Sequence, residues 1–572
     1  MTIYVKESQQ IYDAIVIGSG ITGGWAAKEF CQRGLKTLMI ERGRIVEHRK
    51  DYIGEGKAPW DLPFRSKVPL SLIEEQHSVQ KKCYAFNDAT KHFFGNDRDL
   101  PFQTAKGTDF WWIRANQLGG KSLLWHRYSY RLSDYDFNAN KLDGYGTDWP
   151  LRYNDLKDWY SLVEKHVGIC GQKENLPQLP DSEFLPPFDM TKPEQFVKSK
   201  IEAAFPDRRV IHGRQAHLTK PSKIHLEQGR GQCMARNECQ KGCSFGAYFS
   251  TQSSTLPAAS ETGNLSIAPN SVVHSLIYDE KTNRLKGVRV IDNDDLTERE
   301  YFAKVIFVCA STLGSTQILL NTTSAKFPHG IANSSGVLGH YLMDHNYNAW
   351  ANADIEGFDN EFYSGRRPGG IYIPNFYFQP DKKRPFLRGY GMSAGAYREA
   401  WDDLQASDGF GVDFKNTLKQ PGKWKFYLGA QGEMLPRFEN QVKLHPTLKD
   451  KWGIPQLEIN CTFSENETLM MQDAAEQGAH MLKTIGLTNV KSGVRDKPPG
   501  SGIHELGTAR MGRDPKTSVL NGFNQSHDVP NLFVTDGASF CSSAVQNPSL
   551  TFMALTVRAV NYAVQELNAK RL

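Results

Sequence analysis

The sequence predicts an α/β protein whose central unit is assembled from three separated stretches of chain. Each stretch combines a short apolar run, typical of a buried strand, with a turn of small residues and a helical pattern. The stretches lie near the N-terminus (12–41), in the centre (270–320) and near the C-terminus (531–567). A chain of 572 residues is long enough for two or three domains, and the separation of the stretches indicates a discontinuous one.

The N-terminal stretch has the order strand, glycine turn, helix and second strand. YDAIVI (12–17) predicts a buried parallel strand, and KTLMIE predicts a second strand that ends in Glu41. Between them, Gly18 permits a tight turn, Gly20 lets backbone N–H groups approach a pyrophosphate, and Gly23 permits close packing of helix on strand. Glu41 is placed to hydrogen-bond a ribose hydroxyl. The stretch therefore predicts a Rossmann-like dinucleotide site at the helix N-terminus.

The other two stretches favour FAD over NAD as the nucleotide. An NAD-binding domain usually forms one continuous block, whereas the next strands and helices of this pattern lie hundreds of residues away. The predicted elements are a β-meander in 270–292, a strand, small-residue turn and helix in 304–320, a strand ending in Asp536-Gly537 in 531–540, and a helix in 547–567 with Pro548 in its first turn.

Five motifs make the sequence resemble the glucose–methanol–choline (GMC) family of FAD oxidoreductases. They are VIGSGITGGWAAKEF (16–30), QLGGKSLLW (117–125), SSGVLGHYLMDH (334–345), HELGTARMG (504–512) and VTDGASFCSSAVQNPSLTFMAL (534–555). Within the family, the sequence is most similar to the branch of pyranose oxidases, fructose and gluconate dehydrogenases and bacterial glycoside 3-dehydrogenases. The resemblance implies an FAD-binding domain in residues 1–45, 105–135, 225–345 and 500–572. It also implies a substrate-binding domain with an antiparallel sheet, and inserted loops, in residues 46–104, 136–224 and 346–499.

The chemistry of alcohol oxidation identifies the residue types that the site needs. A hydride leaves the carbon for FAD N5, and a side chain with a pKa near neutral must accept the hydroxyl proton. Histidine is suited to this role, and by resemblance His504 matches the catalytic base. Asn547 matches its partner, which is His or Asn in the family; an amide orients the substrate oxygen but cannot act as the base. His345 and His527 are less favoured as bases.

The resemblance also implies further contacts with FAD. Pyranose oxidases of this branch bind their flavin covalently through a histidine in the GG loop, and the corresponding residue here is Leu124, so we expect non-covalent FAD. The implied contacts are Val273 at the adenine, Asp536 and Gly537 beside the ribityl–pyrophosphate, Gly119 and Gly120 over the isoalloxazine, and Asn547 and Pro548 at the start of the last helix.

Three of the nine cysteines lie close together, with the spacing C-x5-C-x3-C: Cys233, Cys239 and Cys243. Thiolates are soft ligands that suit iron–sulfur clusters and zinc. The spacing resembles the iron–sulfur segment in the large subunits of fructose and glucose dehydrogenases. This implies a [3Fe-4S] or other iron–sulfur cluster that passes electrons toward a cytochrome, often with a small exported subunit. Zinc and unliganded buried thiols are the alternatives.

The composition excludes several other classes of partner. The formal net charge of +5 is small, and basic residues are interleaved with acidic ones, so we expect no nucleic-acid partner. No apolar run is long enough to span a bilayer, so we expect no membrane span. The start MTIYVKESQQ lacks the pattern of a signal peptide. We therefore expect a cytoplasmic protein, or a periplasmic one if an exported partner subunit carries it.

The leading hypothesis is an FAD-dependent dehydrogenase that oxidises a secondary alcohol of a sugar or glycoside to a keto-sugar, with C3 as the position that the family branch implies. His504 accepts the proton, and electrons pass to the cluster or an external acceptor. The alternatives within the family are a sugar oxidase that reduces O₂ to hydrogen peroxide and a polyol or gluconate dehydrogenase. A flavin-bearing electron carrier is disfavoured by the His504–Asn547 pair, and an NAD-binding regulatory protein by the C-terminal motifs.

Overall fold

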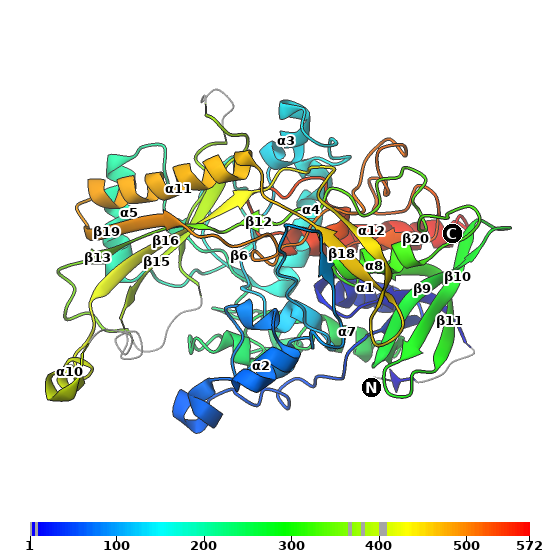
Figure 1. Ribbon diagram of the computed structural model, residues 1–572, viewed down its shortest axis with the longest axis horizontal. Coiled ribbons are helices and arrows are strands. Elements are labelled where there is room, and N and C mark those ends of the chain that lie inside the picture. The colour runs from blue at the N-terminus through cyan, green and yellow to red at the C-terminus, as the bar shows by residue number, and fades with distance from the viewer. Residues whose placement is uncertain (1–2, 6–9, 364–368, 379–383, 400–408) are drawn as a thin grey trace.

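Two large sheets with helices packed on them organise the chain (Figure 1). The computed structural model describes residues 3–5, 10–363, 369–378, 384–399 and 409–572. The first sheet lies on the side of the molecule that carries both chain ends, and the second lies beneath the long helix α11 (Glu465–Thr484) on the opposite side. The fold is therefore the mixed α/β architecture that the sequence predicts.

The first sheet brings the three separated stretches of sequence together. In the described part of the chain it has eight strands in the order β1-β8-β3-β2-β11-β10-β9, with β20 paired to β11. Ile306 is in register with Ile15 on one side and with Leu532 on the other, both in parallel. The strands are β1 (Ile3–Tyr4), β2 (Ile11–Ile17), β3 (Thr37–Ile40), β8 (Leu265–Ala268), β9 (Ser271–Asp279), β10 (Arg284–Asp292), β11 (Glu298–Val308) and β20 (Leu532–Val534).

The centre of this sheet is apolar on both faces. Strand β2 alternates between two clusters, because Ala14 and Val16 pack toward α1 (Ile21–Gln32) and α12 (Ser549–Asn568), while Ile15 and Ile17 pack into the main core. Helix α1 also packs against α7 (Thr255–Glu261). A parallel strand buried on both faces reads as a continuous apolar run, which is why YDAIVI was recognisable.

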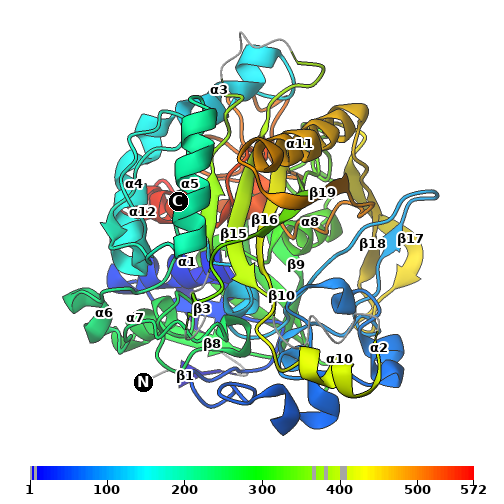
Figure 2. The same ribbon diagram turned by 90° about the vertical axis from the view of Figure 1, so that its left-hand side faces the viewer.

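The second sheet is antiparallel. Among the residues described, its order is β19-β13-β16-β15-β14-β7, and β12 pairs with β16. Helix α11 packs over β13, β16 and β19, and α5 (Lys192–Ala204) packs over β15 (Figure 2). The strands are β7 (Ile211–His212), β12 (His345–Asn346), β13 (Ala349–Ile355), β14 (Ile371–Ile373), β15 (Tyr390–Arg398), β16 (Trp424–Glu433) and β19 (Thr488–Val494).

Shorter elements connect and flank the two sheets. None of the helices within the described ranges combines the length and apolar character needed to cross a bilayer. The remaining helices and strands are α2 (Leu70–Gln76), α3 (Asp134–Asp143), α4 (Tyr153–Val167), α6 (Lys223–Glu227), α8 (Thr312–Asn321), α10 (Gly411–Thr417), β4 (Gln103–Thr104), β5 (Ile169–Cys170), β6 (Phe184–Leu185), β17 (Gln441–Lys449) and β18 (Pro455–Asn460).

The strands of the two sheets come from different parts of the chain. All strands of the first sheet fall within the segments 1–45, 225–345 and 500–572, and β12 crosses the expected boundary at residue 345. Apart from β12, the strands of the second sheet fall within 136–224 and 346–499. The exact domain boundaries stay a prediction.

Candidate active site

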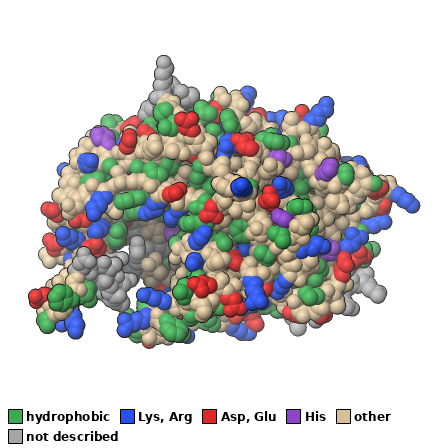
Figure 3. All heavy atoms as spheres, viewed as in Figure 1, with side chains coloured by type: hydrophobic (Ala, Val, Ile, Leu, Met, Phe, Trp, Pro, Cys, Tyr) green, Lys and Arg blue, Asp and Glu red, His purple; other side chains and the backbone are tan. Residues whose placement is uncertain are grey.

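A cavity of about 1520 Å³ is lined by residues of both sheets. On the face shown in Figure 3 the surface is hollowed between α10 and α2. Gly23, Gly119 and Pro548 are not among the described residues that line the cavity. The predicted site residues that do line it are Gly18, Gly20, Glu41, Gly120, Val273, His504, Asp536, Gly537 and Asn547.

The glycine turn has a separate physical reason for each of its glycines. Gly18 has φ +95°, and a Cβ there would lie 2.4 Å from the backbone oxygen of Cys309. A Cβ on Gly23 would lie 1.9 Å from the backbone oxygen of Gly18, so this glycine permits the close helix–strand contact. A Cβ on Gly20 would meet no heavy atom within 4 Å. Gly20 therefore faces open space in the cavity, where a ligand can approach the backbone.

The N-terminus of α1 is open to this space. Gly20 is the N-cap, no side chain caps the helix, and its first turn carries no acidic residue. Free N–H groups and the positive end of the helix dipole form an anion site of the kind that binds a pyrophosphate. The turn is tied to the neighbouring loop, because the backbone N–H of Gly119 donates to Ser19 Oγ at 2.8 Å. Gly119 thus supports the site without lining it.

Glu41 lies at the end of β3, buried beside the glycine turn. It accepts hydrogen bonds from the backbone N–H groups of Ser19 (3.1 Å) and Gly43 (2.9 Å) and from the Ser19 hydroxyl. Burial raises the pKa of the Glu41 carboxyl, and these hydrogen bonds oppose the rise. The carboxylate is therefore fixed in orientation on the cavity wall, as a ribose ligand requires.

The C-terminal strand ends at a second polar group of the cavity. Asp536 accepts from the backbone N–H of Ala538 at 3.0 Å and from the Ser315 hydroxyl. Burial raises the pKa of Asp536 to about 6. Together with the open helix N-terminus, Glu41 and the volume of the cavity, this arrangement fits a dinucleotide of the size of FAD.

His504 is held at the cavity by its backbone and its ring. Its backbone N–H donates to Asp344 Oδ1 at 2.9 Å, and Asp344 Oδ2 also accepts from Gly500 (2.7 Å) and Gly502 (2.9 Å). Its ring Nδ1 lies 3.0 Å from Nδ1 of His345. Burial, with smaller effects of His345 and Lys121, lowers the pKa of His504 well below its ordinary value. At neutral pH the ring is therefore neutral, as a proton acceptor must be.

Asn547 reaches the same site through Tyr347. Asn547 Nδ2 donates to the Tyr347 hydroxyl at 3.3 Å, and this hydroxyl donates to Gln431 Oε1. The Tyr347 ring centroid lies 6.0 Å from that of His504. The two residues predicted to act on the alcohol thus face one cavity, and Tyr347 lies between them.

Several contacts of the site were not predicted from the sequence, in which His345 was named only as a less favoured base. Asp344 and His345 end the SSGVLGHYLMDH motif, so the motif was a signal, but their contacts with His504 were not apparent. Lys121 lies in the GG loop and forms an ion pair with Glu505 at 2.9 Å. His527 is not among the residues that line the cavity; its Nε2 lies 3.0 Å from Ser518 Oγ.

The three clustered cysteines lie beside the main cavity. Cys233, Cys239 and Cys243 line one small hollow, and Ala235 and Asn237 of the same loop line both this hollow and the large cavity. Burial raises the pKa of Cys233 to about 11. Across the residues that the structure describes, no group of three or more His, Cys, Asp or Glu side chains is placed to hold a metal ion. The thiols gather without forming a ligand set, so the iron–sulfur cluster stays a prediction.

The end of the cavity formed by β15 and β16 is aromatic and charged. Tyr363 and Trp424 meet edge to face with centroids 5.8 Å apart, and the Arg398 guanidinium lies 4.7 Å from the centroid of Phe362. Tyr427 also lines this end. Aromatic faces beside charged groups suit a polyhydroxylated ligand.

Comparison with known proteins agrees with the resemblance to the GMC family. Two sequence models of the GMC oxidoreductase family match residues 212–347 and 436–556. The chain is 27% identical to 2-methyl-1,2-propanediol dehydrogenase of Mycolicibacterium austroafricanum, over 96% of this chain and 94% of the relative. It is 25% identical to the fructose dehydrogenase large subunit of Gluconobacter japonicus, over 97% of this chain and 98% of the relative. The crystal structure of pyridoxine 4-oxidase from Mesorbium loti superposes with a TM-score of 0.56 at 16% identity, covering 97% and 99% of the two chains.

Proposed function

Because this chain belongs to the GMC oxidoreductase family, whose members oxidise CH–OH groups with FAD, we propose that it oxidises a secondary alcohol of a sugar or glycoside to a keto-sugar. The observation that carries the proposal is the presence of His504, Asn547 and the open glycine turn on one cavity. The end of that cavity formed by β15 and β16 is aromatic and charged, which suits a sugar. Position C3 rests on the branch that the sequence resembles.

The residues of the chain have distinct roles in this reaction. FAD, when bound, supplies the hydride acceptor. Burial lowers the pKa of His504 below the near-neutral value expected from the sequence. The ring is therefore neutral and has a lone pair for the proton of the substrate hydroxyl, although it is a weaker base than a solvent-exposed histidine. The Asn547 amide orients the substrate oxygen, and its hydrogen bond to Tyr347 fixes the amide. Loss of the proton to a positioned base makes departure of the hydride easier, and such a base typically contributes roughly 10²- to 10⁴-fold to the rate.

The identity of the electron acceptor distinguishes a dehydrogenase from an oxidase. We propose a dehydrogenase that passes electrons to an external acceptor, with a small subunit and a cytochrome as candidate partners. The support is the similarity to a protein named as a large subunit. The cysteine hollow adjoins the main cavity through Ala235 and Asn237, which is compatible with a cluster, but no step of the mechanism depends on one. An oxidase and a polyol or gluconate dehydrogenase are the alternatives.

The first experiment is anaerobic reduction of the bound flavin by a panel of glycosides, free sugars, gluconate and simple diols. We expect a glycoside to bleach the flavin and yield a keto-sugar, identified by NMR, and His504→Gln to retain flavin but reduce it at least about 100-fold more slowly. Bleaching only by diols or gluconate would overturn the substrate class. Full activity of His504→Gln would overturn the assignment of His504 as the base. Peroxide formed at the rate of sugar turnover would favour the oxidase.

Two further measurements test the cofactors. Acid precipitation should release all the flavin, because Leu124 occupies the position of the covalent histidine; a coloured pellet would contradict non-covalent binding. Iron analysis of anaerobically purified protein tests the cluster. Substitution of Cys239 by Ser should abolish any bound iron, whereas Cys541→Ser, a buried cysteine outside the hollow, should not. Iron below one atom per chain in the unmodified protein would count against the cluster.

A further inference from the structure

The second histidine of the site, His345, lies fully buried behind His504. It begins β12, and its Cα is in register with that of Glu433 at the end of β16. Its Nε2 lies 2.9 Å from the backbone oxygen of Ala544, and its Nδ1 lies 3.0 Å from Nδ1 of His504. The function proposed above gives it no role.

These two contacts determine which nitrogen of each ring carries the proton. A carbonyl oxygen only accepts, so the hydrogen bond to Ala544 requires a proton on Nε2 of His345. Burial lowers the pKa of His345 to about 4, so the neutral ring carries no second proton and its Nδ1 presents a lone pair. The short Nδ1–Nδ1 contact then requires His504 to donate from Nδ1. The remaining nitrogen of His504, Nε2, is left with the lone pair.

We propose that His345 is a positioning residue that holds His504 in the Nδ1–H form and thereby leaves its Nε2 free to accept the substrate proton. A neutral imidazole in water prefers the opposite form, with the proton on Nε2, which would block the base. This inference rests on the proposed function, since it assumes that His504 is the base. After proton transfer, the hydrogen bond from His504 Nδ1 to His345 becomes charge-assisted and strengthens.

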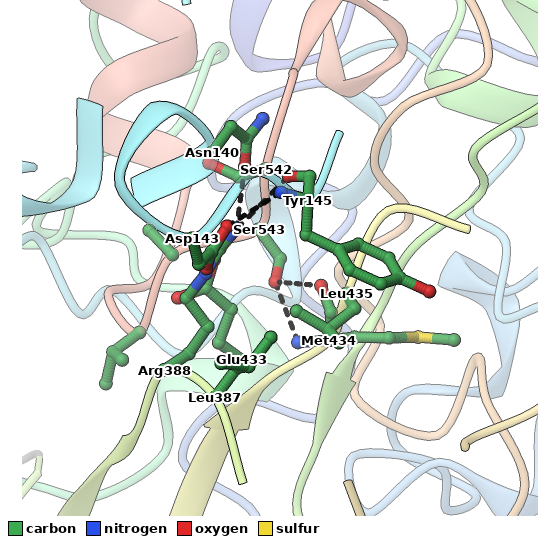
Figure 4. A network of polar contacts seen from close by, with 12 residues as sticks. Asn140, Asp143, Tyr145, Leu387, Arg388, Glu433, Met434, Leu435, Ser542 and Ser543 are labelled. Atoms are coloured by element: carbon green, nitrogen blue, oxygen red, sulfur yellow. Dashed lines mark hydrogen bonds and ion pairs between the residues drawn. The ribbon is translucent and has the colours of Figure 1, made fainter. Parts of the chain in front are cut away.

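A buried polar network fixes the carbonyl on which this depends. Ala544 has φ +57°, a conformation that a non-glycine residue keeps only when its surroundings impose it. Its backbone N–H hydrogen-bonds to the Glu433 carboxylate. Ser543 Oγ accepts from the backbone N–H of Met434 at 3.0 Å and donates to its carbonyl at 3.1 Å, as Figure 4 shows. Ser543 and Ala544 are thus both hydrogen-bonded to the end of β16, at Met434 and Glu433.

Arg388 extends the network to helix α3. Its guanidinium pairs with both Glu433 and Asp143, and its Nη2 donates to Asn140 Oδ1 at 2.9 Å (Figure 4). Asn140 Nδ2 in turn donates to the backbone oxygen of Cys541 at 2.9 Å. Helix α3 and the end of β16 therefore both hold the segment 541–544, which presents its carbonyl to His345.

The charged and titratable groups around the two rings are consistent with neutral histidines. Asp344 binds the His504 backbone and not its ring, and Lys121, which disfavours an added positive charge on His504, is paired with Glu505. Glu433 faces Arg388 and the Ala544 backbone. Neither ring has a hydrogen bond to a carboxylate in the described structure that would favour imidazolium.

The test combines ring ¹⁵N NMR of histidine-labelled holoenzyme with kinetics of three variants. His345→Leu removes the acceptor at similar size, His345→Asn keeps an amide oxygen near the position of Nδ1, and His504→Gln assigns the His504 signal and tests the base. In the unmodified enzyme we expect His504 to carry its proton on Nδ1. In His345→Leu we expect the proton on Nε2, a kcat lower by roughly 10- to 100-fold and a KM changed less than about threefold. His345→Asn should recover most of kcat.

Two results would overturn the proposal. One is a proton on Nε2 of His504 in the unmodified enzyme, a measurement that needs no variant to fold. The other is His345→Leu with unchanged kcat and pH profile while His504→Gln is inactive. If His504→Gln itself is fully active, the proposed function fails, and this result is distinct from failure of the positioning role alone.

Discussion

Alanine substitutions at Gly20 and Gly23 separate cofactor binding from packing. The two glycines lie three residues apart in the same motif, but a Cβ on Gly23 would lie 1.9 Å from a backbone oxygen, whereas a Cβ on Gly20 would meet nothing within 4 Å. Gly20 has φ −64°, which alanine adopts without strain. We expect Gly23→Ala to destabilise the fold and Gly20→Ala to weaken FAD binding alone.

The structure sets the size of each effect. A Cβ on Gly23 would lie 1.9 Å from the backbone oxygen of Gly18, so helix α1 must move away from the end of β2. This overpacking should lower the free energy of unfolding by about 3 kcal/mol. With an unfolding entropy of about 2.1 cal/mol/K per residue, a chain of 572 residues would lose roughly 2–3 °C in Tm. Gly20→Ala should leave the Tm without FAD unchanged or slightly raised, because alanine restricts the unfolded chain by about 0.4–1 kcal/mol.

The assay is thermal unfolding with and without added FAD, together with the flavin-to-protein ratio. FAD should raise the Tm of the unmodified protein and of Gly23→Ala, since a ligand that binds the native state stabilises it. This increase should be lost in Gly20→Ala, whose methyl group occupies the approach to the helix N-terminus. Full flavin content in Gly20→Ala, or a Gly23→Ala variant as stable as the unmodified protein, would contradict these separate roles of the two glycines.

Three further predictions concern charged groups. Arg388→Ala should lower the free energy of unfolding by about 3–5 kcal/mol, because it leaves Glu433 buried without its partner; an unchanged urea midpoint would contradict this. Burial raises the pKa of Asp344 from 3.8 to about 6, so its contribution to stability is complete below about pH 4 and falls by roughly 3 kcal/mol as pH rises to 6. Asp344→Asn should remove that slope from urea titrations, and an identical slope would refute the assignment. Lys121→Met should raise the pKa of His504 and shift the acid limb of the kcat/KM profile upward, because it removes a nearby positive charge; a downward shift would contradict this.

Short stretches of the sequence were enough to predict the buried parallel strands, the glycine turn and the helix that follows it. Each of these features depends on residue types that are close together in the sequence. An apolar run, a regular glycine spacing and the start of a helical pattern can therefore be recognised from a short segment alone. The GMC resemblance extended this to His504 and Asn547, which the structure places on the same cavity. The same local reasoning placed the three cysteines together, but spacing does not specify the directions of their side chains, and the described structure shows no ligand set.

The contacts that join the predicted site residues come from long-range packing. His345 meets His504 across 159 residues of chain, and Tyr347 meets Asn547 across 200. Such contacts depend on how β12, the end of β16 and the C-terminal segment pack together, and no periodicity in the sequence records that packing. The ring nitrogen that is free to accept a proton is fixed by a carbonyl of Ala544. That carbonyl is held by Ser543, Glu433 and Arg388, because a hydrogen bond is directional and requires its acceptor at a defined position in space.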